Sequence, residues 1–258
     1  MSNQPEPLPP ELAGLDELTV AAPEGLFDRV AARWLRVPGP AGDLFVVFTD
    51  HGIAYVGDAG AGDDAELAQA CHRRLARPLV PASKPPAGLL PALRSGHGAK
   101  LQFDLRAVSE FDRAVLTAAR EIPPGQVRPY AWVARRIGRP RAVRAVGSAL
   151  GRNPVPVLIP CHRVIRTDGA LSNYVFGAAV KERLLLGENA NLGEVRELAR
   201  SGVFYLGSDT TGVVCFPSCS HARRITAGHR HGFATLEGAR AEGYRPCRDC
   251  RPDVAEPA

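Results

Sequence analysis

The stretch Val157-Leu158-Ile159-Pro160-Cys161-His162-Arg163-Val164-Ile165 decides which fold and which chemistry are expected of this chain. Apolar residues lead to a proline, and a cysteine, a histidine and an arginine follow it. Only the thiolate form of a cysteine is a nucleophile, and a neighbouring histidine can generate it. Because adjacent side chains of an extended segment point to opposite faces, His162 can reach Cys161 only around a bend or through a bridging water. The alternative is a buried structural cysteine beside a surface histidine.

Three helices are predicted before this stretch. Residues 110–121 carry apolar residues at helical spacing, and Ile122-Pro123-Pro124-Gly125 ends that helix. Tyr130–Ile137 and Pro140–Leu150 are predicted as two further helices, joined through Gly138-Arg139-Pro140. Two short helices connected in this way are typical of a helix-turn-helix.

The charges around these helices are of one sign. From Ile122 to Thr167 there is no Asp or Glu, whereas there are nine arginines, at positions 128, 135, 136, 139, 141, 144, 152, 163 and 166. A solvated helix face normally mixes both signs, so this enrichment indicates binding to nucleic-acid phosphates. A basic surface that only aids solubility is the alternative.

The segment Asn153–Val164 closely resembles the active-site segment of O6-alkylguanine-DNA alkyltransferases, also called methylated-DNA–protein-cysteine methyltransferases, and the resemblance extends from Phe111 to Glu188. It implies a repair protein that flips an alkylated base out of double-stranded DNA and transfers the alkyl group of O6-alkylguanine, and also of O4-methylthymine, irreversibly to Cys161. His162 would take the thiol proton through a water, and Glu188 would orient His162. The resemblance assigns three further roles: Asn153 holds the turn before the cysteine, Tyr130 donates toward the substrate oxygen, and Arg144 fills the gap left by the flipped base. Arg135, Arg141 and Arg152 are predicted as further DNA contacts.

One place departs from the common pattern of this family. Asn173-Tyr174 is followed by Val175-Phe176 before Gly177, where many relatives carry a small or polar residue and then a glycine. These positions border the alkylguanine pocket in the family, so Tyr174, Val175 and Phe176 are predicted to line it. A phenylalanine should narrow the pocket and add a stacking face. Methyl and ethyl adducts are therefore expected to react well, and benzyl adducts poorly.

The N-terminal part carries no chemical motif. Residues 1–25 are predicted as a flexible tail. Strands are expected over residues 44–49 and 53–56, joined by a turn, and over residues 101–105. A helix is expected over residues 63–77 with Cys71 in the core, and residues 78–98 are predicted as a loop. The resemblance suggests that this part is the small sheet domain that precedes the catalytic half in this family.

Two close cysteine pairs lie near the end of the chain. The pair Cys215 and Cys219 is separated by positions 220–246, which are 27 residues, from the pair Cys247 and Cys250. Four thiolates favour a closed tetrahedral zinc site, and zinc would supply much of the folding energy of so small a domain. Two disulfides are the alternative, against which an intracellular, reducing compartment argues. Because four cysteines suffice for zinc, the remaining histidines of this part are interpreted as surface or DNA-facing residues: His221, His229 and His231.

Residues from Glu197 to Asp253 resemble the zinc domain of the Ada response protein, through Gly212–Cys219 and Gly243–Asp253. In that family the first cysteine, here Cys215, accepts a methyl group from a methyl phosphotriester of the DNA backbone. The transfer removes one negative charge, so the affinity for DNA should rise. A purely structural zinc domain that docks on DNA is the alternative. In the Ada protein the zinc domain comes first and an activator-type helix-turn-helix follows it, an order that this chain does not share, which puts transcriptional activation in doubt.

Together these features predict a multi-domain α/β protein. The expected parts are a tail (1–25), a small α/β sheet domain (26–105), a helical, winged-helix-like catalytic domain with the helix-turn-helix (106–190) and a small zinc domain with the four cysteines (197–255). Zinc is the one cofactor expected, with no organic cofactor. The chain of 258 residues has a net charge of +5 and 45% hydrophobic residues, and neither a signal peptide nor a membrane-spanning run is recognised. A cytoplasmic, nucleoid-associated monomer is therefore predicted.

Two other functions compete with alkyl transfer. A DNA-damage sensor or regulator without methyl transfer needs no nucleophile, so Cys161 with its complete set of partners argues against it. A Cys–His hydrolase would need an oxyanion-hole motif, and none is recognised in the sequence.

Overall fold

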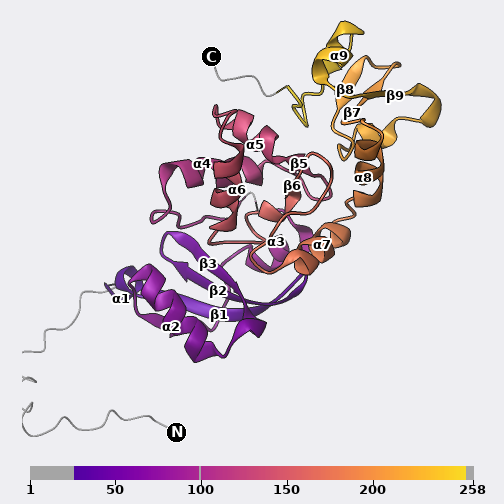
Figure 1. Cartoon of the computed structure of the whole chain (residues 1–258). Coiled ribbons are helices and arrows are strands. Elements are labelled where there is room, and N and C mark those ends of the chain that lie inside the picture. Colours follow the sequence, from indigo (N-terminus) through magenta and orange to yellow (C-terminus); the bar gives the residue numbers. More distant parts are fainter. Residues whose placement is uncertain (1–25, 99, 254–258) are drawn as a thin grey trace, which may run out of the picture.

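The computed structural model describes residues 26–98 and 100–253. The tail predicted over residues 1–25 and the residues after Asp253 lie outside the described residues. The chain runs from a strand-rich N-terminal part through a helical central part to a small C-terminal sheet (Figure 1). This is the mixed α/β architecture that the sequence predicts.

The N-terminal part is built on a four-stranded sheet of order β3-β2-β1-β4. Its strands are β1 (Ala32–Gly39), β2 (Gly42–Thr49), β3 (Gly52–Asp58) and β4 (Leu79–Pro81). The first three strands pair antiparallel, and β4 runs parallel to β1. The helices of this part are α1 (Leu26–Val30), α2 (Asp64–Leu75) and α3 (Leu89–Ser95).

The apolar residues of β2 are buried on both faces of this sheet. Because successive side chains of a strand alternate, Phe45 and Val47 pack on the α2 side with Cys71, which is 2% exposed. Val46 and Leu44 join the large core shared with the central helices. The amide of Val56 in β3 donates to the carbonyl oxygen of Pro154 at 2.9 Å, so the sheet directly supports the segment that leads to Cys161.

Two sequence-based expectations are wrong in this part, and one strand was missed. Strand β1 was not predicted, and the loop expected over residues 78–98 contains β4 and α3. The segment 101–105 is not a strand but makes one bridge, between Phe103 and Ile53. Strand β4 forms through long-range pairing with β1, which local propensity does not report. Pro91 lies in the first turn of α3, where its missing N–H costs no helical hydrogen bond.

The central part is a helical bundle with a two-stranded parallel sheet. Its elements are α4 (Glu110–Arg120), β5 (Arg128–Pro129), α5 (Tyr130–Arg136), α6 (Val143–Gly151), β6 (Val164–Ile165), α7 (Ala178–Gly187) and α8 (Leu192–Arg200). The hydroxyl of Ser109 caps α4 by accepting the amide of Asp112 at 3.1 Å. The predicted pair α5 and α6 is present, but α6 begins at Val143 and not at Pro140, because residues 139–142 form a turn closed by the amide of Ala142 and the carbonyl of Arg139.

The C-terminal part is a second four-stranded sheet, of order β10-β8-β7-β9. Its elements are β7 (Tyr205–Ser208), β8 (Val213–Cys215), β9 (Arg230–Phe233), α9 (Leu236–Ala241) and β10 (Arg245–Pro246). Phe216 and the four cysteines of this part belong to the same buried cluster as Trp132 of α5. The C-terminal part therefore shares its core with the central helices. Within the described residues, no helix combines the length and the apolar character needed to cross a membrane.

Candidate active site and candidate metal centre

Two tight turns shape the backbone on the N-terminal side of Cys161. Pro160 has φ −81° and ψ 60°, and the Cys161 amide donates to the Ile159 carbonyl at 2.8 Å, which is an inverse γ-turn. Val157 has φ 72°, and the Leu158 amide donates to the Pro156 carbonyl at 2.9 Å. A β-branched residue at positive φ is strained, and such strain persists only where the surroundings enforce it. The segment thus bends sharply and ends in a 3₁₀ turn over Cys161–Arg163.

Asn153 holds this bend closed from within. Its side-chain amide donates to the Ile159 carbonyl at 2.9 Å and to the sulfur of Cys161 at 3.2 Å. Its side-chain oxygen accepts the Val155 amide at 3.0 Å. The residue is 4% exposed, and the buried Val155 amide depends on this one side chain for its hydrogen bond.

Cys161 faces a small cavity. The cavity has a volume of about 180 Å³ and is lined by Tyr130, Gly147, Leu150, Gly151, Cys161, Asn173, Tyr174 and Val175. Burial raises the pKa of the Cys161 thiol, an effect that the Asn153 hydrogen bond and the charge of Lys181 oppose. A thiol whose pKa is raised by burial needs a base to form the nucleophile.

His162 and Glu188 form the hydrogen-bonded pair that the resemblance implies. Nε2 of His162 donates to Oε1 of Glu188 at 3.0 Å, and Arg163 donates to the two carboxylate oxygens at 2.7 and 2.9 Å. Burial would raise the pKa of Glu188, but the hydrogen bonds from His162 and Arg163 outweigh it and hold the pKa at about 2. The carboxylate is therefore ionised and can only accept, so the hydrogen of a neutral His162 ring lies on Nε2.

The other ring nitrogen of His162 is left as a base. Burial lowers the pKa of His162, against the opposing effect of Glu188, so the ring is neutral at pH 7. Nδ1 is buried and has no hydrogen-bond partner within the described parts of the chain. No direct hydrogen bond joins it to Cys161 there, which leaves a bridging water as the route between the two groups.

A buried lysine, Lys181, which was not predicted from the sequence, is connected by hydrogen bonds to Tyr130 on the wall of the Cys161 cavity. Nζ of Lys181 donates to the Val164 carbonyl at 2.7 Å and to the hydroxyl of Ser172 at 3.1 Å, and that hydroxyl hydrogen-bonds to the Tyr130 hydroxyl. Lys181 is 1% exposed, and burial lowers its pKa to about 8. In the sequence, Lys181 is only one charged residue of a helical segment, and such a residue usually points to solvent.

Phe176 does not line the cavity beside Cys161, which corrects one prediction from the sequence. It lines a different, smaller cavity together with Val157, and its ring meets that of Tyr174 edge-on at 5.7 Å between centroids. Tyr174 and Val175 do line the Cys161 cavity, and Val175 is 51% exposed at its edge. Val175 and Phe176 are the two central residues of a turn that the Gly177 amide closes on the Tyr174 carbonyl at 2.9 Å, and their side chains face different cavities.

The structure separates the predicted DNA-contacting arginines into two kinds. Arg152 makes a bidentate ion pair with Asp112, at 2.7 and 2.9 Å, and Arg135 lies beside the hydroxyl of Tyr205, whose pKa burial raises and this charge opposes. Arg141 and Arg144 are exposed, and no ion pair involves them within residues 26–98 and 100–253. The second pair is therefore free to contact phosphates.

The four C-terminal cysteines converge on one point. The sulfur atoms of Cys215, Cys219, Cys247 and Cys250 all lie within 4.8 Å of one another, and all four residues are buried. All six cysteines of the chain are described, and none of them forms a disulfide. Four sulfurs at this spacing fit tetrahedral coordination of one metal ion, with metal–sulfur distances of about 2.3 Å. The disulfide alternative is not what the structure contains.

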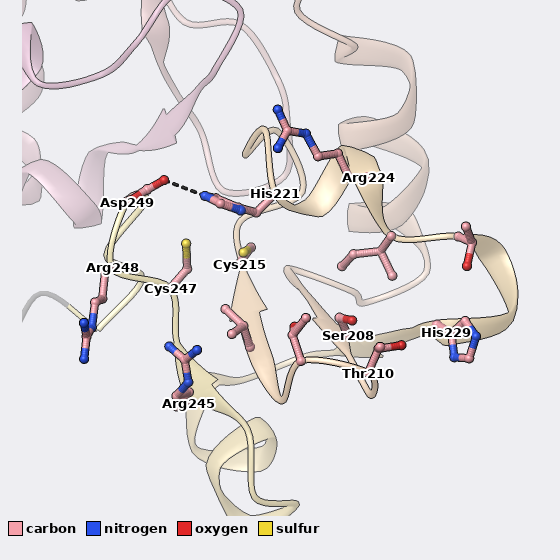
Figure 2. Close-up of a pocket in the computed structure, with 14 residues that line it drawn as sticks. Ser208, Thr210, Cys215, His221, Arg224, His229, Arg245, Cys247, Arg248 and Asp249 are labelled. Atoms are coloured by element: carbon pink, nitrogen blue, oxygen red, sulfur yellow. Dashed lines mark hydrogen bonds and ion pairs between the residues drawn. The ribbon is translucent and has the colours of Figure 1, made fainter.

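A cavity of about 650 Å³ opens beside this cluster. Figure 2 shows that Cys215 and Cys247 are the two cysteines that line it. Three arginines line it as well, Arg224, Arg245 and Arg248, and His221 pairs with Asp249 at 2.5 Å on one side. A site with thiols and several cations suits a phosphate group of a nucleic-acid backbone.

Comparison with known families agrees with both sites. Residues 110–190 match the family described as "6-O-methylguanine DNA methyltransferase, DNA binding domain", and residues 194–253 match "Metal binding domain of Ada". The chain thus contains a segment similar to the DNA-binding domain of 6-O-methylguanine DNA methyltransferases, followed by a segment similar to the metal-binding domain of Ada. The boundaries of the domains predicted from the sequence stay predictions.

Individual relatives support this assignment of the methyltransferase domain. The chain is 50% identical over 93 residues to a methylated-DNA–protein-cysteine methyltransferase of Methanosarcina barkeri, an alignment that covers 35% of this chain and 59% of that protein. The chain is also 45% identical over 91 residues to the bifunctional transcriptional activator/DNA repair enzyme Ada of Escherichia coli. That alignment covers 35% of this chain and 25% of the Ada protein. The Mycobacterium tuberculosis OGT structure in complex with DNA superposes with a TM-score of 0.50 and 26% identity, over 64% of this chain and 99% of that one. The chain thus spans less than two thirds of the M. barkeri relative's length.

Proposed function

We propose that this chain is a single-turnover DNA repair protein that transfers the alkyl group of O6-alkylguanine in double-stranded DNA to Cys161. The observation that carries the proposal is a buried thiol on a small cavity, next to a neutral histidine whose partner is an ionised carboxylate. The methyltransferase names of the relatives support the reaction, and the DNA in the M. tuberculosis complex supports the partner. O4-methylthymine, which carries its methyl group on a comparable ring oxygen, is proposed as a second substrate.

The reaction is a displacement at the alkyl carbon. Nδ1 of His162 takes the thiol proton through a water, and the sulfur of Cys161 attacks the alkyl carbon. The new sulfur–carbon bond forms as the bond from carbon to O6 breaks, and the electron pair stays on the guanine. The Tyr130 hydroxyl, on the cavity wall, gives the leaving guanine a proton, and the hydrogen-bonded Ser172 and Lys181 are placed to replace it. The thioether product is stable, so each chain acts once.

We propose further that the Ada-type domain binds zinc and repairs methyl phosphotriesters. Zinc, when bound by four cysteines, keeps their sulfurs deprotonated. Cys215 is the proposed acceptor: its sulfur attacks the methyl carbon and the phosphodiester anion leaves. Its position on a cavity with three arginines supports this role, because each arginine can hold a backbone phosphate. A structural domain that docks on DNA without accepting methyl groups is the second candidate.

Peptide mass spectrometry of the metal-loaded protein tests both transfers at once. The protein is mixed with duplex DNA that carries O6-methylguanine and methyl phosphotriesters, and with unmodified duplex as the control. A mass increase of one methyl group is expected on Cys161 and on Cys215. Cys71, buried against the N-terminal sheet in a separate apolar cluster, is the internal control and should stay unmodified.

The outcomes separate the proposals. A methyl group on Cys161 alone would reduce the Ada-type domain to a docking module. No methyl group on either residue would favour a DNA-damage sensor or regulator and contradict the repair function. Zinc analysis of the purified protein should find one ion per chain, and sedimentation should give a monomer. A cytoplasmic, nucleoid-associated location follows from the proposed DNA substrate.

A further inference from the structure

The Ada-type domain and the methyltransferase domain share buried polar contacts. The hydroxyl of Ser218, which lies between two of the metal-site cysteines in sequence, accepts the Val127 amide at 3.0 Å and donates to the Val127 carbonyl at 2.9 Å. Arg128, 2% exposed, donates to the same hydroxyl at 3.4 Å, and its guanidinium lies 5.1 Å from the ring centroid of Phe216. The Trp132 indole N–H donates to the Arg251 carbonyl at 2.9 Å. The segment after Ile122 is therefore fixed to residues next to the metal site.

The same segment reaches the catalytic pair through Gly125. A guanidinium nitrogen of Arg223 donates to the Gly125 carbonyl. The Gly125 amide donates to Oε2 of Glu188 at 3.3 Å, and Oε1 of Glu188 accepts from His162 at 3.0 Å. Gly125 has φ 72°, and a Cβ there would lie 2.5 Å from the Glu188 carbonyl oxygen, so the two backbones touch. Hydrogen bonds on both sides of Gly125 thus connect Arg223, through Gly125 and Glu188, to His162.

Arg223 is itself placed by the metal site. Its amide donates to the carbonyl of Cys219 at 3.1 Å, at the start of the short turn Ala222–Arg224. Small domains with four metal-bound cysteines gain most of their folding energy from the metal. Loss of the metal would therefore release both Arg223 and Ser218 from the segment that they hold.

We propose that the metal-loaded Ada-type domain positions the catalytic pair of the methyltransferase domain, with Arg223 acting through Gly125 on Glu188 and His162. Arg223 is a positioning residue, since it acts through other groups and does not contact the reacting sulfur. The inference rests on the proposed alkyl transfer to Cys161. It means that the two domains work as one unit and that the state of the metal site sets the rate at Cys161.

The test compares Arg223→Ala with the wild type in the metal-loaded full chain. The single-turnover rate on O6-methylguanine duplex, measured at saturating DNA, is expected to fall by about ten-fold, because small misplacements of a catalytic group are costly. The part of the pH profile that reports loss of the proton from the His162 ring should also move to lower pH, because weaker contacts with Glu188 lower the pKa of that ring. The other charged groups that act on His162 are Arg163 and Lys181, and neither is changed. Arg223→Lys keeps one donor and is expected to recover most of the rate.

Arg240→Ala is the matched control. Arg240 lies in the same domain, on α9, and is 51% exposed in an ion pair with Asp253, so its loss should leave rate, pH profile and metal content unchanged. Hydrogen exchange of the Gly125 amide gives a readout that does not need activity: Arg223→Ala and chelated protein should exchange faster than the wild type.

The outcomes keep the inference apart from the proposed function. A wild-type rate and pH profile in Arg223→Ala, or unchanged exchange at Gly125, would overturn the inference. An equal loss of rate in Arg240→Ala would overturn it too. A wild type that places no methyl group on Cys161 would overturn the proposed function instead, while the exchange measurement would still decide whether Arg223 holds Gly125.

Discussion

Replacing Glu188 by glutamine should destabilise the folded protein strongly at neutral pH. Its pKa is about 2 in the folded chain against an ordinary value of 4.5. Because one pKa unit is worth about 1.4 kcal/mol, this difference corresponds to about 3 kcal/mol of stability at pH 7. A second route gives the same order, since removing one member of a buried ion pair typically costs about 3–5 kcal/mol. Here the loss would leave Arg163 buried without its carboxylate.

The sign of the pH dependence follows from the direction of the shift. A carboxyl group whose pKa is lowered by folding contributes fully above its unfolded value, and the contribution is lost as the pH falls through the folded value. The difference between wild type and Glu188→Gln should therefore be constant from pH 7 down to about 4.5, and shrink between there and about 2.

Urea unfolding at pH 7, followed by both fluorescence and circular dichroism, measures the effect. Coincident transitions from the two probes are required before a free energy of unfolding is calculated. Glu182→Gln, on the helix α7 that directly precedes Glu188, is the control: the Glu182 side chain is 45% exposed and pairs with Arg196 at 3.4 Å, so its loss should cost under about 1 kcal/mol. If Glu188→Gln costs no more than Glu182→Gln, the reasoning about the buried carboxylate is refuted.

Three further predictions concern the walls of the site. Asn153→Ala should lower the stability by about 1–3 kcal/mol, because it leaves the Val155 amide buried without a partner and removes one of the two hydrogen bonds that the Ile159 carbonyl accepts, and thermal denaturation would detect it. Lys181→Met should raise the pKa of the Cys161 thiol, since a nearby cation favours the thiolate, and the pH dependence of iodoacetamide labelling at Cys161 would report this. Val175→Gly should raise the rate on benzyl relative to methyl adducts more than Phe176→Ala does, because only Val175 lines the cavity; competition kinetics with the two substrates would compare them.

Local sequence was sufficient for the parts of the site that lie close together in the chain. Cys161 and His162 are adjacent, and Pro160 fixes the turn before them. The four metal-site cysteines also lie in two short motifs, so residue type and spacing were enough to predict their convergence. Helices α4 and α5 were predicted within two residues because their stop signals are local.

Contacts between residues that lie far apart in the chain could not be predicted from local sequence patterns. Gly125 donates to Glu188 across 63 positions, and Val127 meets Ser218 across 91, so no local pattern could reveal either. Phe176 was assigned to the pocket from its position in the chain, but the direction of its side chain depends on the turn at Gly177. Strands β1 and β4 needed each other as partners, and neither has a distinctive pattern alone.

The arginine surplus between Ile122 and Thr167 illustrates why counted charge and available charge differ. Arg128 and Arg163 are each 2% exposed, so they cannot contact DNA. Arg152 already pairs with Asp112. Of the nine arginines in that stretch, those that are exposed and lack an acidic partner within residues 26–98 and 100–253 are at positions 139, 141 and 144, in the turn between α5 and α6 and at the start of α6. The next turns of α6 carry Gly147, Leu150 and Gly151, which line the cavity of Cys161. A duplex held by those three arginines would therefore have its backbone next to the cavity entrance, where a base turned out of the stack has the shortest path to the sulfur.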